Sequence, residues 1–301
     1  MRVFVTGGGG FLGRAVVHEL AGRHQVLNLS RSADRETQLE GVERIIGDLA
    51  RPATWENRLR EFSAECCLHL AWEGLPDYSW ASCRRNVDHT LLLTQTLLQL
   101  GIRQLVVAGS CWEYGKGEGL QSEERIPGAL PIFGAAKRAL HLMIGSLADP
   151  EGLQCRWARI FFAYGSGQRD ASLIPTLSRQ FLDGRKLAVR EPGSMQDFIH
   201  IDDVAQGMAM LLQPHVPAGA YNLGTGIPTP AATVANLVAD HYGLPAPYPS
   251  TQAEASGMWA DTRKILQEVG WSPRISLREG VERTLRELDE RPRMKRSVLG
   301  P

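Results

Sequence analysis

Apolar positions in this chain alternate between short continuous runs and repeats of helical period. The first run ends at Thr6, and Leu12, Val16, Val17 and Leu20 then recur at the spacing of one helix face. Strand-like runs are predicted over residues 2–6, 25–30, 42–46, 66–71, 104–109 and 154–161. Helical patterns lie between them, over residues 11–22, 55–62, 84–100 and 133–148. Because strands that alternate with helices form parallel sheets covered on both faces, the pattern predicts a Rossmann-type, doubly wound α/β fold.

The pattern changes after about residue 165, where Pro and Gly become frequent between shorter helical repeats. These repeats are predicted over residues 174–183, 204–212, 231–241 and 261–269. We therefore expect a Rossmann domain over 1–165 and a smaller C-terminal substrate-binding lobe over 166–290, with parts of the two interleaved. Ligands of doubly wound sheets bind at the carboxyl edge of the strands, where this lobe would sit. Residues 291–301 form a basic tail that we expect to fray.

The composition is that of an ordinary globular chain of 301 residues, 43% hydrophobic and 22% charged. Lys+Arg 33 balances Asp+Glu 33, so no net charge favours nucleic acid or a membrane surface as a partner. The five cysteines show no metal-type spacing and are odd in number, which indicates reduced thiols, a cytoplasmic protein and no metal site. The first strand begins at residue 2, so no signal peptide is expected.

A glycine-rich turn joins the first strand to the first helix, with glycines at Gly7, Gly10 and Gly13 around Phe11 and Leu12. Glycine lets the backbone turn sharply and approach a pyrophosphate closely. The helix that follows presents free N–H groups and a positive dipole end to that anion. The turn therefore predicts a dinucleotide-binding site.

The end of the second strand bears on which dinucleotide is bound. An acidic residue at this position holds the ribose hydroxyls of NAD, but this chain has Ser30 followed by Arg31. Because Ser and Arg would bind a 2′-phosphate that a carboxylate repels, we expect NADP(H) to be preferred, with NAD(H) as the alternative. After the third strand, Asp48 and Leu49 are candidates for contact with the adenine.

The chain resembles the extended short-chain dehydrogenase/reductase family, in its NAD(P)-dependent nucleotide-sugar epimerase/dehydratase/reductase branch. The matching motifs lie in order at 6–13, 48–49, 69–71, 86–90, 109–115, 134–137, 159–165, 197–204, 221–226, 260–261 and 270–273. The resemblance implies that Leu70 and Ala71 contact the cofactor. It also implies a homodimer through the helices at 84–100 and 133–148.

The family's mechanism uses a Ser or Thr, a Tyr, and a Lys four residues after the Tyr. Here Ser110 and Lys137 match, and the resemblance implies that Lys137 also holds the nicotinamide ribose. Phe133 stands at the position of the Tyr and has no proton to exchange.

Three interpretations of Phe133 remain open. In the first, another group supplies the proton, and Tyr78 in the loop after the fourth strand is the first candidate. Cys111 is a second candidate, because dehydratases of the family carry an acid one place after the Ser/Thr. In the second interpretation the protein binds cofactor and sugar with little turnover. In the third, Phe133 was introduced by mutagenesis to trap a complex.

The resemblance implies a nucleotide-activated sugar as substrate, with Trp72 and Tyr164 at its pocket. Family members that bind a nucleoside diphosphate usually carry Arg where this chain has Gln196, and Gln cannot replace that charge. The expected activity is an oxidoreductase or epimerase at a sugar hydroxyl or ketone, C4 by analogy. A nucleotide-sugar dehydratase and a catalytically weak NAD(P)-binding protein are the alternatives.

Overall fold

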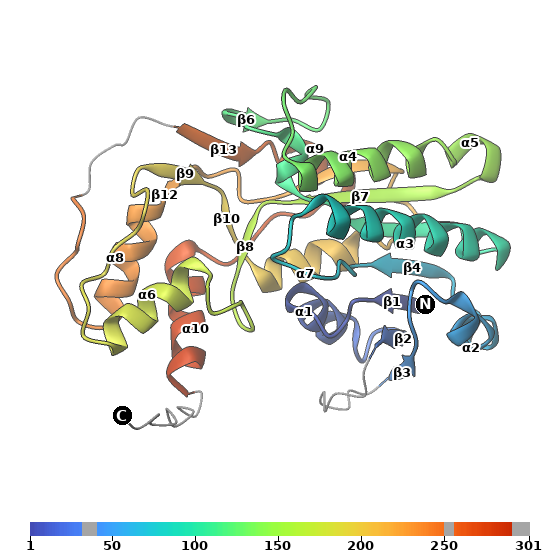
Figure 1. The fold of residues 1–301 in the computed structure, drawn as a ribbon, viewed down its shortest axis with the longest axis horizontal. Coiled ribbons are helices and arrows are strands. Elements are labelled where there is room, and N and C mark those ends of the chain that lie inside the picture. Colours follow the sequence, from blue (N-terminus) through green and yellow to red (C-terminus); the bar gives the residue numbers. More distant parts are fainter. Residues whose placement is uncertain (32–40, 250–255, 291–301) are drawn as a thin grey trace.

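A seven-stranded parallel sheet forms the centre of the larger domain (Figure 1). The structure is a computed structural model that describes residues 1–31, 41–249 and 256–290. The strands are β1 (Arg2–Thr6), β2 (Gln25–Ser30), β3 (Val42–Ile46), β4 (Cys66–His69), β5 (Gln104–Ala108), β7 (Gln154–Ile160) and β11 (Gly219–Leu223). Their order in the sheet is β11-β7-β5-β4-β1-β2-β3. This order confirms the predicted doubly wound fold, and the six predicted strands are all present.

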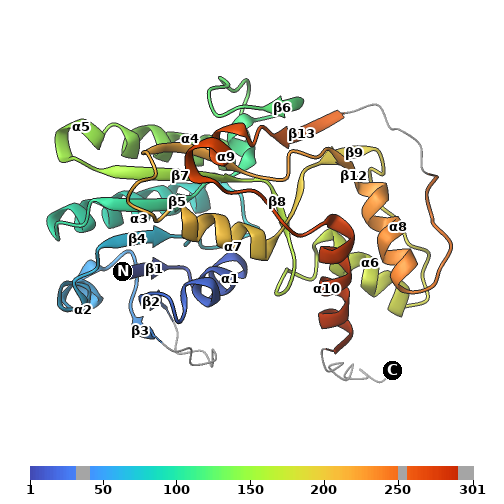
Figure 2. The same cartoon turned by 180° about the vertical axis from the view of Figure 1, so that it is seen from behind.

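Helices cover both faces of this sheet, as Figures 1 and 2 show from opposite sides. One face is covered by α1 (Phe11–Leu20), α7 (Ile201–Met210) and α9 (Arg263–Val269). The other is covered by α2 (Glu56–Phe62), α3 (Trp80–Gln99) and α4 (Ile132–Gly145), with the short η1 (Pro52–Thr54) and α5 (Ala148–Glu151) beside them. No helix within the described ranges is long and apolar enough to cross a bilayer. Both sheet faces are therefore buried, as the apolar strands require.

The smaller lobe is built from three helices and two small sheets. Its helices, α6 (Leu173–Leu182), α8 (Ala231–His241) and α10 (Leu277–Glu290), share one hydrophobic core. The strand β8 (Phe162–Tyr164) pairs with β10 (Phe198–His200). The second sheet has the order β12 (Thr229–Pro230), β9 (Ser194–Gln196), β13 (Ser256–Ala260) and β6 (Gly119–Gln121).

Several elements were not predicted from the sequence, namely the short strands of the two small sheets, β11 and α10. The last two show how such elements depend on tertiary packing. The strand β11 lies in the Pro- and Gly-rich part of the chain but pairs with β7 at the edge of the large sheet. The helix α10 is mostly charged, and its buried apolar positions lie on the one stripe that packs against α6 and α8. Because α7, β11 and α9 return to the larger domain and β6 joins the smaller lobe, the two units interleave. The basic tail predicted over 291–301 lies outside the described residues.

Candidate functional site: a dinucleotide pocket beside an aromatic cluster

The glycine turn between β1 and α1 packs too closely for side chains. A Cβ on Gly13 would lie 2.0 Å from the carbonyl oxygen of Gly7, and one on Gly7 would lie 2.6 Å from the Ala71 nitrogen. Gly7 also has φ +79°, which favours glycine. The helix begins after Gly10 with no side-chain cap, so N–H groups of its first turn remain for a ligand. The turn therefore has the geometry of an anion site.

A pocket of about 380 Å³ opens beside this turn at the carboxyl ends of β1 to β4. It brings together eight of the predicted cofactor residues: Gly7, Gly10, Ser30, Arg31, Asp48, Leu49, Leu70 and Ala71. Trp72, predicted at the substrate pocket, lines this pocket as well. Phe11, Leu12 and Gly13 form the first turn of α1 next to it, and Lys137 lies on α4.

The residues present fit a dinucleotide. The uncapped helix and the glycine cradle suit a pyrophosphate, and the indole N–H of Trp72 is buried with no acceptor among the described residues. Asp48 faces the pocket while its carboxylate accepts the Ala50 N–H at 3.0 Å, which holds the pKa of Asp48 below its usual value. Asp48 thus stabilises its own turn and lines the pocket together with Leu49.

Gly13→Ala is expected to weaken dinucleotide binding by at least about tenfold, because the added methyl group displaces the Gly7 carbonyl and with it the anion site. Titration calorimetry with NAD⁺ would measure the loss. Gly145→Ala on α4 is the matched control, since a Cβ there meets nothing within 4 Å. Equal affinity in the Gly13 variant and the wild type would contradict the pyrophosphate assignment.

Ser110, Phe133 and Lys137 gather at the carboxyl end of β5. Ser110 caps the short helix η2 (Cys111–Tyr114) and accepts the Trp112 N–H at 3.3 Å. The Lys137 ammonium donates to the Ala108 carbonyl at 2.7 Å and lies 4.2 Å from the centre of the Trp72 ring. Burial lowers the pKa of Lys137 from 10.5 to about 8. Lys137 is thus held in place by a hydrogen bond at a site where burial disfavours its charged form.

An aromatic cluster surrounds the Phe133 position. The ring centre of Tyr78 lies 5.2 Å from that of Phe133. The ring centre of Trp72 also lies 5.2 Å from that of Phe133, and these two rings meet edge to face. Tyr78 is 45% exposed. The structure therefore brings Tyr78 next to Phe133, the residue for which the resemblance predicts the position of the catalytic Tyr.

Two predicted site residues are buried. Cys111 is 2% exposed and packs with Tyr114, Phe161, Met258 and Ala260, and burial raises the pKa of its thiol. A thiol that is buried in an apolar cluster and has a raised pKa is a weak acid out of reach of a ligand, so its burial argues against the proton-donor role predicted for Cys111.

Tyr164 is also buried. It is 2% exposed and belongs to the core of the smaller lobe, where its hydroxyl donates to the Leu277 carbonyl at 3.4 Å. Its side chain therefore supports the lobe core, and its place at the substrate pocket stays a prediction.

Gln196 lies on β9, between β12 and β13 of the smaller lobe. Its neighbour Asp197 connects segments that are distant in the chain through hydrogen bonds. Asp197 accepts N–H groups from Thr225, Gly226 and Ala260 at 2.7 to 2.9 Å, which makes its role structural. Among the described residues no group of three or more His, Cys, Asp or Glu side chains could hold a metal ion.

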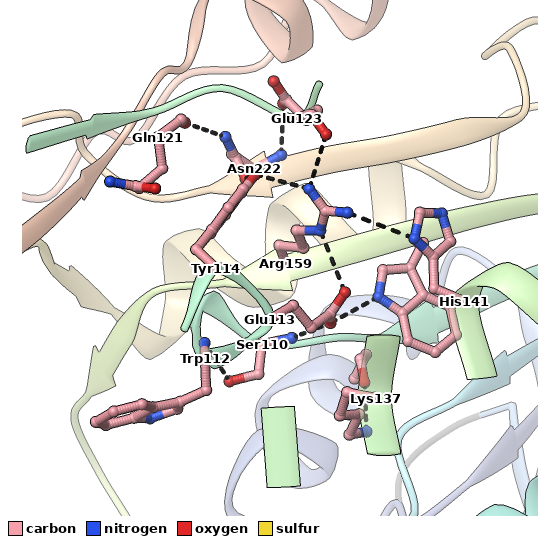
Figure 3. A network of polar contacts seen from close by, with 12 residues as sticks. Ser110, Trp112, Glu113, Tyr114, Gln121, Glu123, Lys137, His141, Arg159 and Asn222 are labelled. Atoms are coloured by element: carbon pink, nitrogen blue, oxygen red, sulfur yellow. Dashed lines mark hydrogen bonds and ion pairs between the residues drawn. The ribbon is translucent and has the colours of Figure 1, made fainter. Parts of the chain in front are cut away.

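A buried polar network adjoins the turn that carries Ser110 (Figure 3). Glu113 accepts the Ser110 N–H and the Trp157 indole N–H, each at 2.8 Å. Its second oxygen pairs with Arg159 at 3.2 Å, and both side chains are almost fully buried. Arg159 also donates to the Tyr114 hydroxyl at 2.9 Å. The network fixes the turn that carries Ser110.

Three titratable residues of the pocket were not assigned to the cofactor from the sequence: Arg44, Glu73 and His89. His89 could have been found, because it lies three residues after Asn86 and so on the same face of α3. Arg44 lies on β3, a strand too exposed for alternation to stand out. Glu73 forms an ion pair with Arg31, which is distant in the chain, and no local sequence pattern predicts that contact.

Comparison with known proteins agrees with this geometry. A model of the NAD dependent epimerase/dehydratase family matches residues 3–224, well over half of the chain. The dTDP-L-rhamnose 4-epimerase of Burkholderia thailandensis is 25% identical, with 93% of each chain covered. The UDP-glucose 4-epimerase of Mycolicibacterium smegmatis is 26% identical, with 95% of this chain and 97% of the relative covered.

Among solved structures, MoeE5 in complex with UDP-glucuronic acid and NAD aligns with a TM-score of 0.83 and 27% identity, covering 96% of this chain and 99% of MoeE5. This neighbour holds NAD and gives the predicted preference for NADP no support. The fold matches that of MoeE5 along nearly the whole chain. The chain therefore belongs to the NAD dependent epimerase/dehydratase family, whose members include nucleotide-sugar epimerases and dehydratases.

Proposed function

We propose that this protein is an oxidoreductase or epimerase that acts at the C4 hydroxyl or ketone of a nucleotide-activated sugar, with Tyr78 as its proton carrier. The observation that carries the proposal is the contact between Tyr78 and Phe133, 5.2 Å between ring centres. Phe133 lies one helical turn before Lys137, where a Tyr would act in the resembling family. A phenol from a neighbouring loop thus stands beside the position that lacks one.

Each residue has a defined task in this proposal. The Ser110 side chain caps η2 and accepts the Trp112 N–H at 3.3 Å, and in this proposal its hydroxyl orients the substrate oxygen. Lys137 is anchored by Ala108 and presents its ammonium to the ribose of the cofactor. Tyr78 takes the proton from the sugar hydroxyl, or returns it to the ketone. When bound, the nicotinamide supplies or accepts the hydride.

The described residues of the site offer little free positive charge to a cofactor 2′-phosphate or to the phosphates of the substrate. Ser30 and Arg31 line the pocket as a 2′-phosphate site would require, yet Arg31 is already paired with a carboxylate at 2.9 Å. The Gln196 position offers no positive charge to a diphosphate. The nucleotide part of the substrate would therefore be bound by hydrogen bonds and aromatic surface more than by charge.

We further propose a homodimer built on α3 and α4, in the cytoplasm. These helices pack together, and α4 exposes Leu142 and Met143 beside a groove that Leu91 and Leu98 line. All five cysteines are free, as expected in a reducing compartment. Light scattering that gives the mass of a monomer would overturn the dimer.

Incubation with UDP- and dTDP-sugars and either nicotinamide cofactor tests the activity. Net oxidation of the reduced cofactor identifies a reductase, whereas interconversion of two sugars without net oxidation identifies an epimerase. Loss of water from the sugar would identify a dehydratase instead. Tight cofactor binding with no turnover of any sugar would contradict the proposed enzyme.

A further inference from the structure

An ion pair crosses the cofactor pocket above the glycine turn. Arg31 follows β2 and Glu73 follows β4, and these two strands flank β1 in the sheet. The Arg31 guanidinium donates to Glu73 at 2.9 Å, and both residues line the pocket. The second Glu73 oxygen accepts from Arg85 at 3.2 Å. The cation that would meet a 2′-phosphate is therefore already partnered.

Glu73 is held in place more firmly than an ordinary surface acid. The side chain of Asn86, itself buried on α3, accepts the Glu73 N–H at 2.8 Å and donates to the Glu73 carbonyl at 3.1 Å. The Glu73 side chain is only 25% exposed between its two arginines. The Arg31 side chain is 67% exposed, so the fixed partner of this pair is the Glu73 carboxylate, which loses little further entropy when it pairs.

We propose that Glu73 selects NAD over NADP, replacing the acidic residue that the end of β2 lacks. This inference rests on the proposed dinucleotide binding. A 2′-phosphate that approaches Arg31 must either break the pair or lie next to the Glu73 carboxylate, and both cost free energy. The 2′-hydroxyl of NAD carries no charge and can donate a hydrogen bond to a carboxylate. The same pocket thus accepts one dinucleotide and disfavours the other.

Glu73→Gln keeps the shape of the side chain and removes its charge. We expect wild-type protein to bind NAD⁺ more tightly than NADP⁺, and Glu73→Gln to shift the ratio of the two Kd values by about tenfold toward NADP⁺. Titration calorimetry with each cofactor measures the ratio without any turnover. Adding Arg31→Gln to Glu73→Gln should remove the gain, because the phosphate then loses its guanidinium partner.

Glu19→Gln is the matched control. Glu19 on α1 is 26% exposed and pairs with Arg23, which follows that helix, at 2.5 Å, and neither residue lines the pocket. Removing the Glu19 charge should leave the ratio of the Kd values for NAD⁺ and NADP⁺ unchanged. A wild type that prefers NADP⁺, or a ratio unmoved by Glu73→Gln, overturns the selector role. Binding of neither dinucleotide to the wild type would instead refute the proposed function.

Discussion

Tyr78→Phe is expected to lower kcat by about 10²- to 10⁴-fold, the usual contribution of a general acid or base. The substitution removes one hydroxyl and keeps the ring that packs against Phe133 at 5.2 Å. Binding of the cofactor and the sugar should change little, so the loss should appear in kcat and not in the Kd of NAD⁺. Steady-state kinetics with the active sugar, together with cofactor titration, would measure both.

A second substitution shows whether the lost activity is that of a proton carrier. In the Tyr78→Phe background, Phe133→Tyr restores a phenol four residues before Lys137, and we expect it to recover at least about tenfold in kcat. Tyr248→Phe is the control, because its hydroxyl accepts the Val189 N–H in the smaller lobe. Unchanged turnover in Tyr78→Phe would show that another group carries the proton. A large gain from Phe133→Tyr alone would point to a site that has lost its phenol or been trapped by substitution.

Arg159→Met is expected to lower the free energy of unfolding by about 3 to 5 kcal/mol, because it leaves Glu113 as a buried charge without its partner. The Tyr114 hydroxyl and the Glu123 carbonyl lose their guanidinium donors as well. Urea unfolding followed by circular dichroism measures the change. Because the network holds the turn of Ser110, activity should fall at temperatures where the fold persists.

The cause of this destabilisation can be separated from loss of packing. Glu113→Gln added to Arg159→Met removes the uncompensated charge and should recover part of the stability. Arg278→Met, whose partner Asp240 and own side chain are each about 60% exposed, should change stability by less than about 1 kcal/mol. Equal effects of the two arginine substitutions would mean that the buried pair contributes no more than a surface one.

The sequence was most informative where structure is local. The strand, glycine turn and helix at residues 2–20 are contiguous, and their glycines are required by contacts within that turn or with the neighbouring strand. The candidates Ser110 and Lys137 came from the resemblance to the family, whose motifs are themselves short and local. Periodicity and turn chemistry report such features, because each depends on residues only a few positions apart.

The sequence was least informative about what meets across the sheet. Tyr78 is exposed and Tyr164 is buried, although both are tyrosines near predicted site motifs. Cys111 follows Ser110 directly, yet its side chain points into an apolar cluster because η2 turns it away from the site. Burial of this kind depends on elements distant in the chain, such as β13 and α10, that no local pattern positions.

By itself, then, the sequence determined a doubly wound dinucleotide-binding fold, its phosphate turn and the absence of a phenol at Phe133. The tertiary structure decided which groups surround that position and what charge faces the cofactor. It placed Tyr78 against Phe133 and Glu73 against Arg31, contacts between segments far apart in the chain. The physical reason is that backbone periodicity is written into neighbouring residues, whereas the environment of a side chain is set by whichever strands and helices the fold brings beside it.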